Sequence, residues 1–333
     1  MAIGNQTDFE IYDSEFFSGM NEVLQQYTNV FNEGSQGAIR LVTQEIRGDF
    51  ERQSFMRKIA NGTISHRDTS STDTVTPQKM EQGELTAPKI NRRIGPNSNT
   101  LDAWKKIAED PQIFSFFYGQ QVAEDVAADW LNTVMLAGVT AIETEDTGDH
   151  QMVYDATEET DPRLRTEYLV RGLKLLGDRA QRIRAWVMHS DSFYNLVESQ
   201  ILDQVTNVAD VVIYGGVPGT LNRPVIVTDS PSLVTGEYDD EYRVLGLTED
   251  AFTATQSEQQ DIYSEVELGR ENLVMTIQGE YAFQTRVKGF DYTGGANPDD
   301  ATIGSGSNWS FEMHDRKLGP GVMIKVAAEN GSE

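Results

Sequence analysis

Residues 112–141 constrain the fold most, because they have the apolar spacing of one long helix. Apolar side chains recur there at steps that bring them to one face; they include Ile113, Phe117, Val126, Trp130, Val134 and Ala137. Thirty residues at a rise of about 1.5 Å each would give a helix of about 45 Å. A helix of that length favours a plate-like or elongated protein over a compact enzyme.

Charge and cysteine content narrow the class of protein. The 333 residues carry a formal net charge of -26, and none of them is cysteine. Affinity for nucleic acid comes largely from Lys and Arg that neutralise phosphates, so a dedicated duplex binder is disfavoured. Disulfide and thiol chemistry are excluded. The first residues show no secretory signal pattern, and no apolar stretch is long enough to predict a membrane span.

Residues 61–98 are rich in Thr, Ser, Pro and Gly and poor in large apolar side chains. We expect a long excursion that buries little core: either disordered, or an extended hairpin that needs a partner. Residues 56–93 contain seven basic and four acidic side chains, a net charge of +3 in an acidic chain. Two interpretations remain open, namely a mixed-charge solvated loop and a basic arm that lies on the acidic surface of a neighbouring copy.

The remaining pattern mixes helices and strands. We expect helices at 13–32, 99–110, 164–182 and 191–203, with Pro111 ending the second. Residues 145–160 are predicted to be an acidic loop. Strands are expected at 37–46, 184–189, 208–216 and 223–230, and the chain from 242 onward is strand-rich. The middle of the chain therefore predicts a compact α/β unit.

His189, Ser190 and Asp191 have the side-chain types of a hydrolase triad. Consecutive residues that leave a strand point to alternate faces, so these three cannot converge as a triad does. The G-x-S-x-G pattern of a nucleophile elbow is also missing, since Met188 and His189 precede the serine. We predict instead that Ser190 is the helix N-cap and that Asp191 complements the helix dipole.

No other motif predicts chemistry. The glycines of 215–220 lack phosphate-loop spacing, and the acidic clusters at 145–149 and 297–300 lack the ligand spacing of a calcium loop. The four histidines share no local metal-ligand spacing. We therefore expect no catalytic residue, no cofactor site and no metal site.

Several segments, in the same order along the chain, resemble the major capsid proteins of tailed bacteriophages, the Hong Kong 97-like family. The segments that carry the resemblance are "AWVMHSDSFYNL" (185–196), "LNRPVIVTDS" (221–230), "FQTRVKGFDY" (283–292), "NPDDATIGSGSNWSF" (297–311) and "DRKLGPGVMIKV" (315–326). The resemblance implies an α+β fold with an N-arm, an E-loop hairpin, a long spine helix, a P-domain sheet and a compact α/β A-domain. It places these parts at 1–55 (N-arm), 56–98 (E-loop), 99–145 (P-domain with spine helix), 146–245 (A-domain) and 246–333 (mainly P-domain strands and the carboxyl-terminal return).

The resemblance also implies a function. The chain would assemble with itself, as pentamers and hexamers, into an icosahedral virion shell around double-stranded DNA, without sequence-specific DNA binding and without a membrane. A separate scaffolding protein, a portal and possibly a decoration protein would be its partners, and assembly would take place in the bacterial host cytoplasm. On the E-loop and its continuation, we expect contacts between subunits at Lys79, Lys89, Arg92 and Arg93. The alternatives are an encapsulin-type nanocompartment shell and, less favoured, a soluble hydrolase.

Overall fold

A computed structural model describes most of the chain, and its secondary structure mixes strands and helices. The described residues are 20, 32–43, 48–57, 64, 66–75, 77, 79–100, 102–103, 111–207, 220, 223–235, 241–256, 261–269 and 271–327. The expected strand at 208–216 lies outside them, as do nearly all of the expected helix at 13–32 and most of that at 99–110.

The first sheet has six strands and contains the longest strands of the described structure. Its order is β1 (Ile39–Thr43), β9 (Phe252–Gln256), β11 (Val274–Val287), β3 (Gln82–Thr100) and β2 (Phe50–Met56), and β10 (Asp261–Glu267) also pairs with β11. All pairs are antiparallel except β1 with β9. Because β11 is long, it pairs with β10 along its first half and with β9 along its second half.

Helix α3 (Pro111–Glu143) packs against this sheet and confirms the predicted long helix. Its 33 residues span about 50 Å. Trp130 lies against Phe283 of β11, with 6.2 Å between the ring centroids. Gly138 lets the helix approach β9 closely, because a Cβ there would lie 2.1 Å from Cζ of Phe252.

The second sheet forms the centre of the predicted α/β unit. Its order is β4 (Val153–Asp155), β14 (Gly321–Ala327), β8 (Glu241–Thr248), β5 (Ile183–Met188) and β6 (Val225–Val227), and β7 (Val234–Thr235) also pairs with β8. Two helices belong to this unit, α4 (Thr166–Leu176), which packs on β14, and α5 (Ser190–Asn207), which follows β5. Trp186 of β5 is fully buried and lies over Gly246 of β8, where a Cβ would be 2.6 Å from the ring.

Short elements complete the fold. A two-stranded sheet joins β12 (Phe290–Tyr292) to β13 (Trp309–Phe311), and β12 lies beside β3. The short helices are α6 (Asp300–Ile303), η1 (Gly177–Arg182), η2 (Pro231–Leu233), η3 (Gly306–Asn308) and η4 (Arg316–Leu318). Within the described residues, no helix is both long and apolar enough to cross a membrane.

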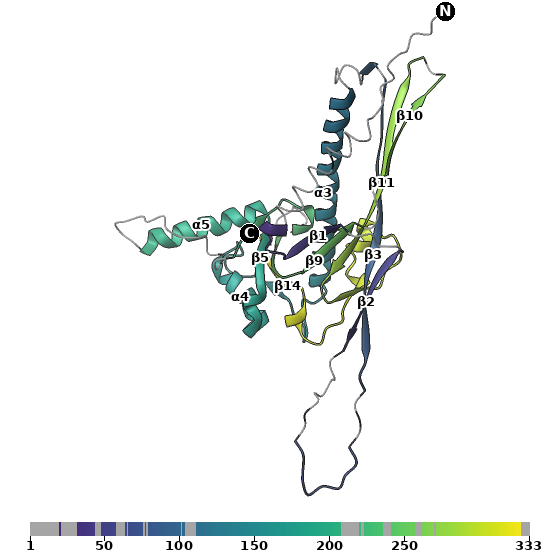
Figure 1. The fold of residues 1–333 in the computed structure, drawn as a ribbon. Coiled ribbons are helices and arrows are strands. Elements are labelled where there is room, and N and C mark those ends of the chain that lie inside the picture. Colours follow the sequence, from purple (N-terminus) through teal and green to yellow (C-terminus); the bar gives the residue numbers. More distant parts are fainter. Residues whose placement is uncertain are drawn as a thin grey trace, which may run out of the picture.

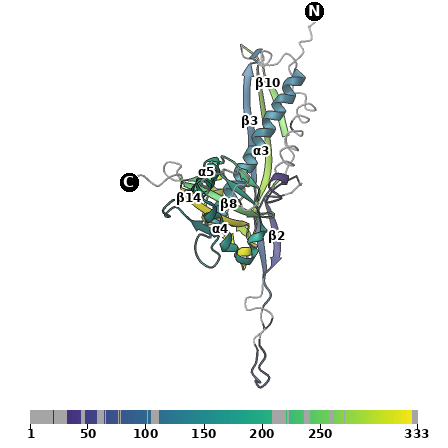
Figure 2. The same cartoon turned by 90° about the vertical axis from the view of Figure 1, so that its left-hand side faces the viewer.

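The two views show an elongated molecule (Figures 1 and 2). The ribbon made by β3 and β11 runs along the long axis with α3 beside it, and the second sheet with α4 and α5 extends to one side (Figure 1). The connection between β2 and β3 projects from one end of the ribbon, and β10 lies toward the other end (Figure 1).

Glu143, the last residue of α3, links this helix to the second sheet. Its carboxylate accepts from Arg243 Nη2 of β8 at 2.8 Å and lies 2.7 Å from Lys325 Nζ of β14. Burial alone would raise the pKa of Glu143, but the hydrogen bond to Lys325 and the charges of both cations outweigh it and hold the pKa below its ordinary value. A single carboxylate thus joins α3 to two strands of the second sheet.

Some expectations about local structure were wrong. The segment 82–98 was expected to bury little core, but it belongs to β3, where Ala87 and Ile90 are buried. Residues 99 and 100 end that strand and do not begin a helix. The predicted acidic loop at 145–160 contains the short strand β4. β14 comes from the expected carboxyl-terminal return, yet it pairs within the second sheet, because its alternating residues complete that core.

Candidate subunit interface

The connection between β2 and β3 carries exposed apolar side chains that the described chain does not cover. Met80 is 68% exposed, and Ile64 and Val75 are more exposed still, as is Met56 at the end of β2. Apolar side chains of this size are costly to leave in water, so burying them against another molecule would be favourable. We call residues 57–81 the connecting loop, and its outer part stands away from both sheets (Figure 1).

An ion pair links the described base of the connecting loop to the body. Arg57 directly follows β2, and its guanidinium pairs with the carboxylate of Glu312, next to β13. The amide of Arg57 also donates to the carbonyl of Glu81 at 2.9 Å, which closes the loop where β3 is about to begin. The direction in which the loop leaves the body is therefore set at its base.

The four predicted interface residues do not share one environment. Lys79 lies in the connecting loop and is exposed. Arg93 is exposed on β3, where its Cα pairs with that of Glu280 on β11. Lys89, also on β3, is only 8% exposed, because the strand is central in the sheet there. The structure therefore leaves Lys79 and Arg93 on the surface and places Lys89 inside its own chain.

Arg92 makes ion pairs within its own chain, and its predicted contact with a neighbour stays a prediction. Its Nε lies 3.3 Å from Asp129 of α3, and its Nη2 pairs with Asp300 of α6. Tyr281 donates to Asp129 at 2.6 Å, so β3, α3, α6 and β11 meet at one cluster. Burial would lower the pKa of Arg92, but the two carboxylates outweigh it and raise that pKa. The Arg92 side chain therefore links β3 to α3 and α6.

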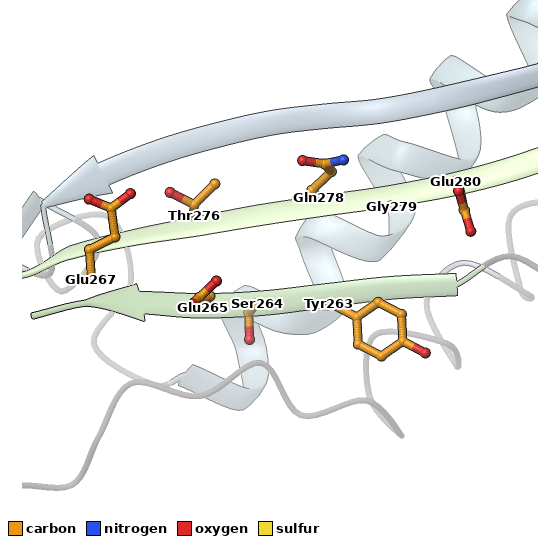
Figure 3. Close-up of a pocket in the computed structure, with 8 residues that line it drawn as sticks. All are labelled: Tyr263, Ser264, Glu265, Glu267, Thr276, Gln278, Gly279 and Glu280. Atoms are coloured by element: carbon orange, nitrogen blue, oxygen red, sulfur yellow. The ribbon is translucent and has the colours of Figure 1, made fainter.

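An acidic groove lies along the face of the hairpin formed by β10 and β11 (Figure 3). It has a volume of about 430 Å³. The lining residues are Tyr263, Ser264, Glu265, Glu267, Thr276, Gln278, Gly279 and Glu280. Three of these are carboxylates, and Tyr263 is 75% exposed. Gly279 has no side chain to fill the groove between its neighbours.

The sequence contains a signal for this groove that residue-type reasoning missed. In "DIYSEVE" (261–267), acidic side chains occupy alternate positions, together with one tyrosine. Alternate residues of a strand share one face, so Tyr263, Glu265 and Glu267 lie on the same side of β10. The register of β10 and β11 places Thr276 opposite Glu265 and Gln278 opposite Tyr263. The alternation predicts an acidic strand face, but not the groove itself.

The predicted helix cap lies one residue earlier than expected. Helix α5 begins at Ser190, and His189 Nδ1 accepts from the amide of Asp191 at 3.2 Å. His189 is thus the N-cap, and Ser190 is the first helical residue, whose amide donates to Asp229 at 3.3 Å. The imidazole stacks on Tyr242, with 5.1 Å between centroids. Among the described residues, no group of three His, Asp or Glu side chains could hold a metal ion.

Comparison with solved structures defines the class of protein. The capsid of Ralstonia phage GP4 matches at a TM-score of 0.50 and 13% identity, covering 90% of this chain and 89% of that one. The capsid of cyanophage P-SCSP1u matches at 0.50 and 11%, covering 89% and 88%, and Mycobacterium phage Adephagia at 0.50 and 8%, covering 88% and 89%. The fold is the α+β Hong Kong 97-like fold of phage capsid proteins.

The sequence itself then gives the family. Residues 8–323 match the family model described as major capsid protein 13-like, and the chain belongs to that family. A search of curated proteins found no match. The protein is a coat protein that assembles with itself into the shell of a phage virion, as the resemblance in its sequence indicated.

Proposed function

We propose that the shell is held together in part by a directional contact between copies, in which the connecting loop of one copy lies in the acidic groove of the next. The loop offers Lys79 beside the exposed apolar Met80, and the groove offers Glu265 and Glu267 beside Tyr263. Opposite charges on the two surfaces would set the register, and the apolar side chains would supply burial. The unfilled groove and the uncovered loop in one chain carry this proposal.

The contact we propose is heterologous, because two different surfaces of the same chain meet. Such contacts form closed rings when the rotation between copies closes, as pentamers and hexamers require. The loop and the β10 hairpin extend toward opposite ends of the long ribbon, so each copy would reach one neighbour and receive another (Figure 1). Arg93, exposed beside Glu280, would add a cation at the margin of the groove.

The remaining parts of the proposed function concern partners. The proposed role is structural, with no catalysed reaction, cofactor or metal assigned to the chain. We propose that a separate scaffolding protein and a portal direct assembly in the host cytoplasm around double-stranded DNA, and that a decoration protein is a further partner.

The excess of 53 acidic over 27 basic residues supports a shell wall that does not adhere to packaged DNA. Expression with and without the phage's scaffolding protein would test the role of that protein, because unaided assembly into uniform closed shells would contradict it.

A charge exchange tests the contact between loop and groove. We expect Lys79→Glu and Glu265→Lys each to reduce the yield of closed particles at low salt, and the double variant to restore it, because the exchange rebuilds the pair. Electron microscopy and sedimentation measure particle yield. Lys174→Glu, at an exposed lysine of α4, is the matched control and is expected to assemble normally. A double variant that assembles no better than either single variant would refute the contact without bearing on the family assignment.

A further inference from the structure

His189 lies where three elements of the second sheet meet. The carboxyl ends of the parallel strands β5 and β6 bring His189 and Asp229 to the same edge, and α5 starts there. His189 Nε2 lies 3.4 Å from Asp229 Oδ1, and Nδ1 lies 3.5 Å from Asp191 Oδ2. The side chain is 15% exposed. A single imidazole thus has a carboxylate at each nitrogen.

The hydrogen bonds at the ring define its neutral form. Nδ1 accepts from the amide of Asp191, so Nδ1 carries no proton in this state and the proton of the neutral ring is on Nε2, toward Asp229. A protonated ring has a proton on both nitrogens and cannot accept. Histidine is the side chain that commonly changes charge between about pH 5 and 8. Protonation would therefore remove the cap from the first turn of α5.

The surroundings of the ring offer the protonated form a replacement. Its titratable contacts are Asp191 of α5, Asp229 after β6 and Tyr242 of β8, whose hydroxyl donates to Asp191 at 2.9 Å. In the described residues, neither carboxylate has an ion pair with Lys or Arg. Hydrogen bonds from the side chain and amide of Ser190 lower the pKa of Asp229, as does the charge of His189, so this carboxylate stays charged while a histidine titrates.

We propose that His189 is a proton-operated switch at the base of α5. Unprotonated, the ring caps the helix through the Asp191 amide. Protonated, it leaves the cap and holds the carboxylates of Asp191 and Asp229, so that Asp191 is drawn from Tyr242 and the first turn of α5 loosens. Figure 1 shows α5 projecting from the second sheet, away from the ribbon. Its first turn joins it to β5, and Leu196 in the next turn is buried in the core of the second sheet.

Hydrogen exchange of the first turn of α5 tests the switch in the full-length chain. After correction for the intrinsic pH dependence of exchange, we expect protection of residues 190–193 to fall about fivefold from pH 7.5 to pH 5.5, the effect of losing one cap. His189→Asn keeps a cap acceptor but cannot titrate, so it should show no such change. His66→Asn, at an exposed loop histidine, should behave like the wild type. Equal pH responses in wild type and His189→Asn would overturn the proposal.

Two further measurements keep the test decisive if His189→Asn folds poorly. Asp229→Asn removes one anion that favours the protonated ring, so the midpoint of the wild-type transition should move to lower pH, and an unchanged midpoint would count against the switch. Nitrogen NMR of the histidine ring should show the Nε2–H tautomer at neutral pH, whereas the Nδ1–H tautomer would contradict the capping geometry. All three readouts are local to α5, so they do not depend on the contact between loop and groove.

Discussion

Glu143 shows how much of this fold depends on single ionised side chains. The carboxylate is partly buried at the end of α3 and pairs with Arg243 and Lys325, on two strands of the other sheet. Removing one partner from such a cluster leaves the others without compensation, which costs more than the pair itself contributes. The same reasoning applies to Arg92, which two carboxylates hold between β3, α3 and α6.

We expect Glu143→Gln to lower the free energy of unfolding by about 2 kcal/mol at neutral pH, since two charge-assisted bonds are lost. The pKa of Glu143 lies below its ordinary value of 4.5, so its contribution is present above that pH and is lost as the pH falls through the folded-state pKa. The difference between wild type and variant should therefore shrink below about pH 4.5. Urea unfolding of the unassembled chain at several pH values measures it. Glu198→Gln, at an exposed position of α5, is the control, and a pH-independent difference would contradict the assignment.

At the start of α5, the sequence correctly predicted a polar N-cap but placed it at Ser190, one residue after the position that the structure uses. A polar residue between a buried strand and a helix predicts a cap, and Ser190 is a better intrinsic cap than histidine. The structure uses His189 because Asp229, forty residues further along the chain, accepts the amide of Ser190. Asp229 follows β6, a distant strand in the sequence, and no local pattern indicates it.

At the scale of elements, Gly138 permits α3 to cross β9 at close range. We expect Gly138→Ala to destabilise the chain by about 1–3 kcal/mol, because the new methyl would overlap the ring of Phe252. Alanine is otherwise favoured over glycine in a helix, so a stabilised variant would show that the two elements can separate at no cost. Thermal or urea unfolding measures the change. Gly295→Ala, where a Cβ meets nothing within 4 Å, is the control.

Elements were predictable where one pattern dominates. α3 was predicted because its apolar side chains recur at helical spacing, and β5 because it is a short run of mostly apolar residues. An extended hairpin at 61–98 was one of the two expectations, but the burial within β3 was not predicted, because its buried stretch holds few apolar residues and is flanked by polar ones. β3 is buried by its neighbours β11 and β2 in the same sheet and by β12 of the two-stranded sheet. None of these strands is adjacent to its buried stretch in the sequence. Tertiary contacts therefore override a weak local preference there.

At the scale of the whole molecule, a net charge of -26 opposes association, and salt acts on it in two ways. Raising the ionic strength from about 0.1 to 1 M shortens the screening distance from about 10 to 3 Å. We expect assembly of the wild type to improve with salt, since repulsion between copies weakens, while the assembly defect of Lys79→Glu shrinks, since the loop contact is screened as well. Light scattering of assembly at several salt concentrations measures both. A Lys79→Glu defect that is the same at all salt concentrations would point to a steric cause.

The acidic groove and the loop could be predicted only in part. Composition showed a basic segment in an acidic chain, and the alternation at 261–267 shows an acidic strand face. Neither reveals that β10 and β11 form a groove with Gly279 at its centre, because that depends on register between strands. Lys89 and Arg92 were predicted to lie at a contact between subunits, and charge alone did not indicate that Lys89 is buried in β3 or that Arg92 pairs with Asp129 and Asp300.

The place of β14 in the second sheet has a consequence for biosynthesis. Residues 321–327 lie between β4 and β8, so an inner strand of that sheet is the last of its strands to leave the ribosome. β1 likewise waits for β9, which is more than two hundred residues later. At about 5–20 residues per second, a nascent chain spends several seconds without either sheet complete. A nascent chain therefore cannot present the finished surface of either sheet until its late strands have been made.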